Sequence, residues 1–232
     1  MEKPRLRHRI EHTRNKHSRA VCRGNTIIIR LARNLSESEE HEHIQNLLRR
    51  MTHLVLQERR RKSVDPFRQI LQGAQSLTVQ LATGKRYVFS LFPGRRTGAR
   101  RTAKGWRVSV GPSTRRRALH RFLWSLLSRE ELPRLRALVH SVNARNVGVR
   151  IADVHSHFAT TQWGSCSPRG IIMLNTALLF LPPSVLRYVI VHELAHRIVP
   201  NHSRAFWREV ERAMPTYERA YDALHDYRLP QL

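Results

Sequence analysis

The sequence has little cysteine and no long apolar run. Cys22 and Cys166 are the two cysteines in 232 residues, and neither belongs to a CxxC pair. This excludes a disulfide framework and a cysteine-based zinc knuckle, and it is typical of a reducing cytoplasm, where we expect the protein to be. The most apolar stretch, residues 171–191, contains polar residues and two prolines. A membrane helix needs about 20 apolar residues in succession, so we expect no membrane contact, and the N-terminus lacks the apolar core of a signal peptide.

Acidic residues are also scarce. The chain has 17 Asp and Glu against 42 Lys and Arg, a net charge of +25, and 37 of the basic residues are Arg. Residues 1–150 hold 34 basic and 10 acidic residues, whereas residues 151–232 hold 8 and 7. The planar guanidinium group suits phosphate and carboxylate contacts, so the Arg-rich N-terminal part is a candidate surface for nucleic acid or another polyanion. A solvated basic face without a partner fits the same composition, because charge alone rarely identifies a partner.

The N-terminal part shows mainly strand patterns. We expect a hairpin that turns near Gly24, with residues 26–31 as its second strand, and then an amphipathic helix over residues 37–61. Ser36 and Glu39 have the spacing of a capping box at the start of that helix. Alternating patterns predict strands within residues 77–94 and 105–111, and the Arg-rich, glycine-punctuated segment between them predicts a loop.

The C-terminal part alternates helical and strand patterns. Residues 113–147 predict two helices separated near Pro133, and residues 147–154 and 171–178 predict strands. A further helix is expected from Ser184 until Pro200 ends it. The predicted class is therefore α+β, with a β-rich basic N-terminal part over residues 1–112 and a second region over residues 113–232.

The last predicted helix contains His192-Glu193-Leu194-Ala195-His196. Residues four apart on a helix lie about 40° apart around its axis, so His192 and His196 can bind one metal ion. Glu193 is displaced by one position and can meet a metal-bound water without being a ligand. The 14 His and 13 Glu of this chain predict about 0.05 chance occurrences of the HExxH pattern, so composition does not explain it.

A catalytic zinc site usually takes three protein ligands and leaves a fourth position for water. His202 is the leading third ligand, because it follows the break at Pro200 and directly precedes a predicted helix start at Ser203. Glu209 and Glu211 on that following helix are alternatives. A separate site at Asp153, His155 and His157, which would share one face of a strand, is also ligand-like in spacing but lacks a partner comparable to Glu193.

An ordered set of motifs resembles the YgjP-like metallopeptidases, which are related to SprT-like and other zincin hydrolases. The set consists of Trp163-Gly164-Ser165-Cys166-Ser167, Leu174-Asn175, the HELAH helix, Asn201-His202-Ser203 and Phe206-Trp207. The resemblance covers most of the chain and is weakest across residues 63–112. It implies a zincin-like core with an HExxH helix and a small antiparallel sheet, one Zn²⁺ per chain held by His192, His196 and His202, and Glu193 as the catalytic carboxylate. Gln162 departs from the Arg that the family often has before this Trp.

The function that these residues favour is zinc-dependent hydrolysis of peptide bonds in a polypeptide substrate, with Glu193 as general base. Alternatives are a metal-dependent hydrolase of nucleotides or other phosphorylated small molecules, and a nucleic-acid-associated protease or binding protein. The oxyanion stabiliser stays open among Tyr217, Tyr221, His225 and Arg197. The candidate substrate-binding residues are Trp163, Gly164, Ser165, Cys166 and Asn175.

Overall fold

The computed structural model describes residues 6–103 and 105–230. Its contacts divide the chain into two compact units, Met1–Lys62 and Ser63–Leu232, each with its own hydrophobic core. The division therefore falls 50 residues before the boundary expected at residue 112. The reason is that Val79, Phe89 and Val108, from the strands before residue 112, share one buried cluster with Leu123 and Trp124 from the helix that follows.

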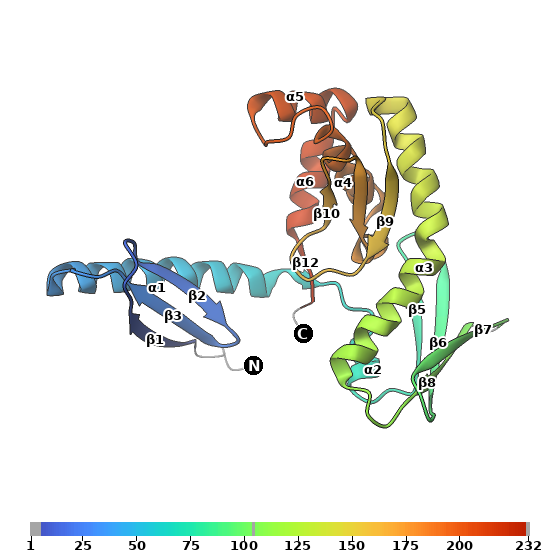
Figure 1. Ribbon diagram of the computed structural model, residues 1–232, viewed down its shortest axis with the longest axis horizontal. Helices are drawn as coiled ribbons and strands as arrows, with labels where there is room; N and C mark the ends of the chain where they lie inside the picture. The colour runs from blue at the N-terminus through green and yellow to red at the C-terminus, as the bar shows by residue number, and fades with distance from the viewer. Residues whose placement is uncertain (1–5, 104, 231–232) are drawn as a thin grey trace. The chain divides into compact units, whose positions relative to one another are not determined.

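The first unit is a three-stranded sheet covered by one helix. Its elements are β1 (Arg7–His12), β2 (Arg19–Arg23), β3 (Thr26–Leu31) and α1 (Glu37–Arg60). β2 and β3 form the expected hairpin, which turns at Gly24 with a φ of +60°, and β1 runs parallel to β3. α1 lies along the sheet (Figure 1) and packs on Ile27 and Ile29. The capping box is confirmed, because Ser36 and Glu39 each accept the other's backbone N–H.

The second unit begins with a four-stranded sheet that follows the short strand β4 (Lys62–Ser63). The elements of this part are α2 (Arg68–Leu71), β5 (Ser76–Gln80), β6 (Arg86–Pro93), β7 (Gly98–Thr102) and β8 (Gly105–Val110), in the sheet order β5-β6-β8-β7. β7 lies in the Arg-rich segment for which we expected a loop. That prediction is wrong because the segment pairs antiparallel with β8, and the guanidinium of Arg101 packs over the ring of Trp106 at 5.5 Å.

One long helix, α3 (Arg116–Val142), replaces the two helices expected around Pro133. It ends in a π-helical turn, η1 (Asn143–Val147). Proline removes one backbone donor and disfavours a helix interior. The helix nevertheless continues, because Leu127 before Pro133 and Leu135 and Val139 after it are all buried in the same core. Tertiary packing therefore outweighs the local preference.

The remaining elements include a small sheet. Its strands are β9 (Asp153–His157), β10 (Gly164–Cys166) and β11 (Ile171–Asn175). The other elements are the 3-10 helix η2 (Thr176–Phe180), α4 (Pro183–Ala195), α5 (Arg204–Ala213), α6 (Tyr217–His225) and β12 (Tyr227–Arg228). The sheet order is β10-β11-β9, which leaves β10 at an edge. The sheet is mixed rather than antiparallel, because β10 and β11 form a hairpin and β9 pairs parallel to β11.

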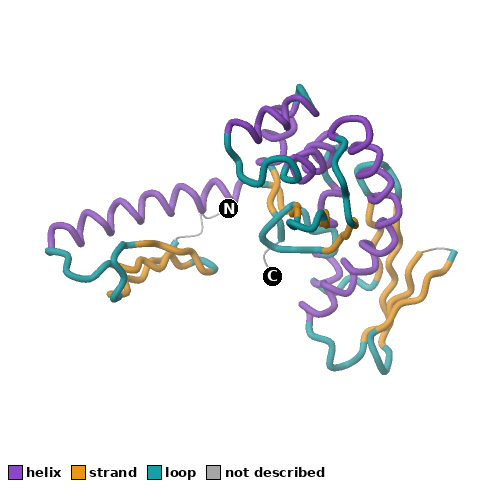
Figure 2. The backbone as a smooth tube through the Cα atoms, turned by 45° about the horizontal axis from the view of Figure 1, so that its top comes forward, coloured by secondary structure: helices purple, strands orange, loops and turns teal. Residues whose placement is uncertain are grey.

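Helices cover this small sheet from two sides. α3 packs along β9, and α4 packs against β10 and β11, as Figures 1 and 2 show. The mixed helix and strand content is that of an α+β protein, as predicted. In the part of the chain that the structure describes, no helix is long and apolar enough to span a bilayer.

Candidate active site

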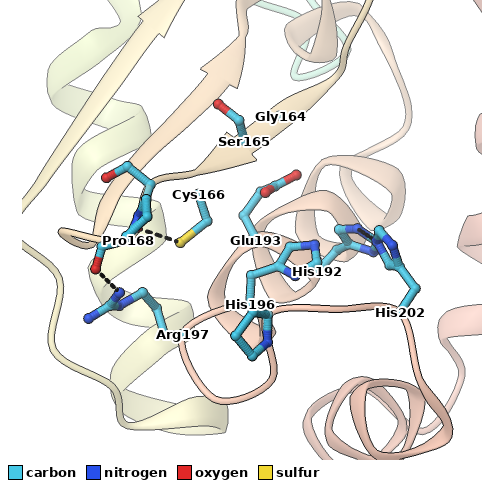
Figure 3. A pocket seen from close by; sticks show the side chains of 11 residues that line it. Gly164, Ser165, Cys166, Pro168, His192, Glu193, His196, Arg197 and His202 are labelled. Atoms are coloured by element: carbon cyan, nitrogen blue, oxygen red, sulfur yellow. Dashed lines mark hydrogen bonds between the residues drawn. The ribbon is translucent and has the colours of Figure 1, made fainter.

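Three histidine side chains converge at the end of α4. His192 lies in the last turn of α4, His196 caps the helix, and His202 lies in the segment before α5. One ring nitrogen from each lies within 4.8 Å of the other two, and the Nε2 atoms of His192 and His202 are 3.1 Å apart. Among the described residues this is the one group of three or more His, Cys, Asp or Glu side chains with metal-binding geometry. Figure 3 shows the three imidazoles facing a common point.

Packing from α5 holds the three rings in place. Phe206 is fully buried, and its ring centroid lies 4.9 Å from that of His192, 4.6 Å from that of His196 and 4.8 Å from that of His202. The segment between the helices places His202 opposite α4, because α5 starts directly after Ser203. Helical spacing thus positions His192 and His196, and the docking of α5 positions His202.

Hydrogen-bond partners on the far side of two rings select which nitrogen faces the site. The Tyr188 hydroxyl lies 3.3 Å from Nδ1 of His192, and Nδ1 of His196 lies 3.4 Å from the carbonyl oxygen of Val199. Such partners fix the ring orientation and leave Nε2 available for a metal ion. Sequence reasoning missed Tyr188, although its position four residues before His192 places both on one face of α4.

Charge and burial at the centre favour a metal ion. Burial, together with the neighbouring His196 and His202, lowers the pKa of His192 to about 4, so its imidazole is neutral at physiological pH. Neutral imidazole nitrogens are the form that binds zinc and similar ions. Three imidazoles grouped in this way, with His192 neutral, therefore suit a divalent metal ion.

Glu193 points into the same pocket from α4. Its side chain is 6% exposed, and no described residue donates a hydrogen bond to its carboxylate. Burial raises the pKa of Glu193 to about 8. A buried carboxyl group whose pKa lies near neutrality has the proton affinity that a general base needs.

The backbone of β10 forms the opposite wall of the pocket. The pocket measures about 640 Å³ and is lined by Gly164, Ser165, Cys166, Ser167, Pro168, His192, Glu193, His196, Arg197, Pro200 and His202. A Cβ atom at Gly164 would lie 2.6 Å from Oε1 of Glu193, closer than side-chain atoms approach one another. The missing side chain at Gly164 is therefore what lets the carboxylate lie against the edge strand (Figure 3).

Comparison with known proteins agrees with this geometry. A family model described as the YgjP-like metallopeptidase domain matches residues 15–227. The chain belongs to the YgjP-like metallopeptidase family. It is therefore a hydrolase of the metallopeptidase class, and the resemblance noted from its motifs is confirmed.

This YgjP-like chain is 30% identical to the metallopeptidase zymogen of Pyrococcus abyssi abylysin, a solved structure, over 38% of this chain and 87% of that one, with a TM-score of 0.34. No curated protein matches the chain.

The predicted substrate-binding residues of this YgjP-like protein do not all line the pocket. Gly164, Ser165 and Cys166 line the pocket, whereas Trp163 and Asn175 are not among its lining residues. Asn175 is fully buried, and its amide donates to the carbonyl oxygens of Ala159 and Gln162 while accepting from the N–H of Ala177. Asn175 therefore organises the chain beneath the pocket and has no free group to offer a substrate.

The alternative ligands lie elsewhere. The Glu209 carboxylate accepts a hydrogen bond from Arg212 at 2.9 Å, and neither it nor Glu211 joins the histidine group. The Asp153 carboxylate pairs with Arg136 and His155 instead of forming a metal-binding group on β9.

The four candidates for the oxyanion stabiliser lie in different places. Arg197 lines the histidine pocket, and its guanidinium donates to the carbonyl oxygen of Pro168 at 2.7 Å. Tyr217 and Tyr221 line a neighbouring pocket, and His225 packs on Tyr221.

Proposed function

We propose that this protein is a zinc-dependent peptidase with a zincin-like core within residues 113–232. His192, His196 and His202 would hold one Zn²⁺ per chain, and Glu193 would act as the general base in peptide-bond hydrolysis. The observation that carries the proposal is the convergence of three imidazoles beside a buried carboxylate that has no hydrogen-bond donor among the described residues.

Each residue has a separate task in this reaction. Bound zinc supplies Lewis-acid polarisation of the scissile carbonyl and lowers the pKa of water to about 7. Glu193 takes the proton of the attacking water and delivers it to the leaving amine. The partners of the ring nitrogens, the Tyr188 hydroxyl and the Val199 carbonyl, keep His192 and His196 oriented.

The open edge of β10 offers a way to bind the substrate backbone. Trp163 and Ser167 direct their backbone groups toward β11, where the Trp163 carbonyl accepts from Asn175 and the Ser167 N–H donates to Ile171. Because backbone groups alternate sides along a strand, those of Gly164 and Cys166 face the open edge. An extended peptide paired with this edge would pass through the pocket beside Glu193.

The test combines metal content with turnover. We expect Glu193→Gln to keep one zinc per chain and to lower kcat/KM on peptide substrates by about 10²- to 10⁴-fold, the usual contribution of a general base. A double variant, His192→Ala with His196→Ala, should lose the zinc. Metal is measured by mass spectrometry of protein purified without added metal.

Glu209→Gln is the matched control, because it removes a carboxylate of the same kind that lies outside the pocket and pairs with Arg212. It should leave metal content and turnover unchanged. Wild-type turnover by Glu193→Gln, or equal zinc in the double histidine variant and the wild type, would overturn the proposal.

A further inference from the structure

A second pocket lies next to the histidine centre, between α5 and α6. It measures about 460 Å³ and is lined by Trp207, Tyr217, Glu218, Tyr221 and Asp222. Trp207 comes from α5, and the other four residues come from the first two turns of α6. The pocket thus combines three aromatic rings with two carboxylates, a composition quite different from that of the histidine pocket.

The aromatic rings present both faces and edges around this pocket. Trp207 stacks on Tyr217 with ring centroids 5.7 Å apart and an interplanar angle of 23°, and it meets Tyr221 edge-on at 5.8 Å. Tyr188, which is buried, lies behind both tyrosines with centroids at 6.3 and 6.0 Å. Rings grouped in this way attract cations through the negative potential of their faces.

The two carboxylates are unpaired in a chain dominated by arginine. Glu218 and Asp222 are exposed and lie four residues apart on α6, so they share one face of the helix. Neither forms an ion pair with any residue in the described part of the chain, although basic residues outnumber acidic ones by 42 to 17. An open acidic site beside aromatic rings is complementary to a positively charged group.

The location of the pocket ties it to the proposed reaction. The Trp207 ring centroid lies 6.1 Å from that of His192 and 6.2 Å from that of His202, so this ring separates the two pockets. A long side chain of a substrate residue bound close to the metal centre would have to pass Trp207 to enter this pocket.

We propose that this pocket is a subsite for the cationic side chain of a lysine or arginine in the polypeptide substrate. The inference rests on the proposed peptidase function, and it adds the class of side chain that the enzyme selects near the scissile bond. The rings would pack on the aliphatic stem and the charged head, while Glu218 and Asp222 would pair with the charge.

Equilibrium binding tests the subsite without relying on turnover. The probes are fluorescein-labelled octapeptides of alanine and glycine that carry one arginine at each position in turn, with citrulline counterparts that keep the shape and remove the charge. They are titrated by anisotropy against zinc-loaded Glu193→Gln protein, which would bind without cleaving. At one or two positions we expect arginine to bind about 10-fold more tightly than citrulline, with a preference that weakens in high salt.

Two variants in the same background locate the effect. Asp222→Asn should reduce the preference for arginine several-fold, whereas Asp226→Asn, one turn further along the chain and outside the pocket, should leave it unchanged. Equal affinity for arginine and citrulline at every position, or an equal loss in Asp226→Asn, would overturn the subsite.

Parallel assays of the wild-type enzyme separate this inference from the proposed function. Cleavage of both peptide sets with no dependence on the arginine would support the peptidase and overturn the subsite. Charge-dependent binding without any cleavage would support cation binding in this pocket and contradict the peptidase function.

Discussion

Two buried glutamates of the second unit have opposite surroundings. Glu131, on α3, is fully buried and accepts hydrogen bonds from Lys85 at 2.8 Å, from Arg134 at 2.6 Å and from the Tyr87 hydroxyl. Burial by itself raises the pKa of Glu131, but these three donors outweigh it and bring the pKa below the ordinary value of 4.5. Glu193, on α4, is nearly as buried and has no such donor among the described residues, so its pKa rises to about 8.

The difference shows that burial alone does not define the role of a carboxylate. At Glu131 three donors form hydrogen bonds to the carboxylate. These bonds tie α3 to β6 and keep the carboxylate ionised. At Glu193 the space against Gly164 is kept free of donors, which leaves the carboxylate able to accept a proton during the reaction. The first arrangement stabilises the fold, and the second gives up stability for chemistry.

Exchanging each carboxylate for its amide tests this comparison most strongly. Glu131→Gln should lower the free energy of unfolding by about 2 kcal/mol, because it removes the charged acceptor from two cations and a buried hydroxyl. Glu193→Gln should instead raise it in metal-free protein at pH 7, because a carboxyl group whose pKa rises to about 8 on folding destabilises the folded state above pH 4.5, and the amide does not titrate. Urea unfolding of both variants after chelation measures the two values, and equal losses would remove the distinction.

The pH dependence of stability sharpens the comparison further. A carboxylate with a lowered pKa in the folded state stabilises the protein above its unfolded pKa, and this contribution is lost as pH falls through the folded value. The stability difference between wild type and Glu131→Gln should therefore be largest near pH 7 and shrink below about pH 4.5. Unfolding curves of both proteins between pH 3 and 7 would show this, and a constant difference would contradict it.

The smallest expected effect comes from the glycine beside Glu193. Gly164→Ala places a Cβ atom 2.6 Å from Oε1 of Glu193, so the carboxylate must move and kcat/KM should fall about 10-fold. Gly98→Ala, whose Cβ would lie 3.5 Å from Ser109 Oγ in ordinary contact, is the matched control and should leave kcat/KM unchanged. Full activity of Gly164→Ala would show that the carboxylate position is less constrained than the structure indicates.

The histidine centre was largely predictable because its information is local. Helical spacing links His192 to His196, and the break at Pro200 followed by a helix start favours His202 as their partner. The assignment of these residues as zinc ligands stays a proposal for the metal analysis to test. Glu131, by contrast, sits in an ordinary helical pattern, and its partners Lys85 and Tyr87 are more than 40 residues away in the sequence.

The wrong predictions have different causes. The break at Pro133 and the loop in the Arg-rich segment followed from local preference, whereas Asn175 was a substrate-binding candidate because of its place in the motifs that resemble the family. Burial on both sides of Pro133 depends on core residues that are distant in the sequence. The pairing of β7 with β8 is a local hairpin, and the Asn175 amide bonds reach Ala159 and Gln162, 16 and 13 residues away. The aromatic pocket was missed because Trp207 and the tyrosines of α6 meet only through the docking of two helices.

The shortness of β10 has a consequence for turnover. The strand spans three residues, and only Gly164 and Cys166 present backbone groups to the open edge, which limits a paired chain to four hydrogen bonds. At about 1 kcal/mol each, these bonds hold an extended chain for a short residence time. Once the bond is cut, each fragment keeps only part of them. We therefore expect product release to be fast and the chemical step to limit the rate, with sequence preference set by side chains and not by the length of the bound chain.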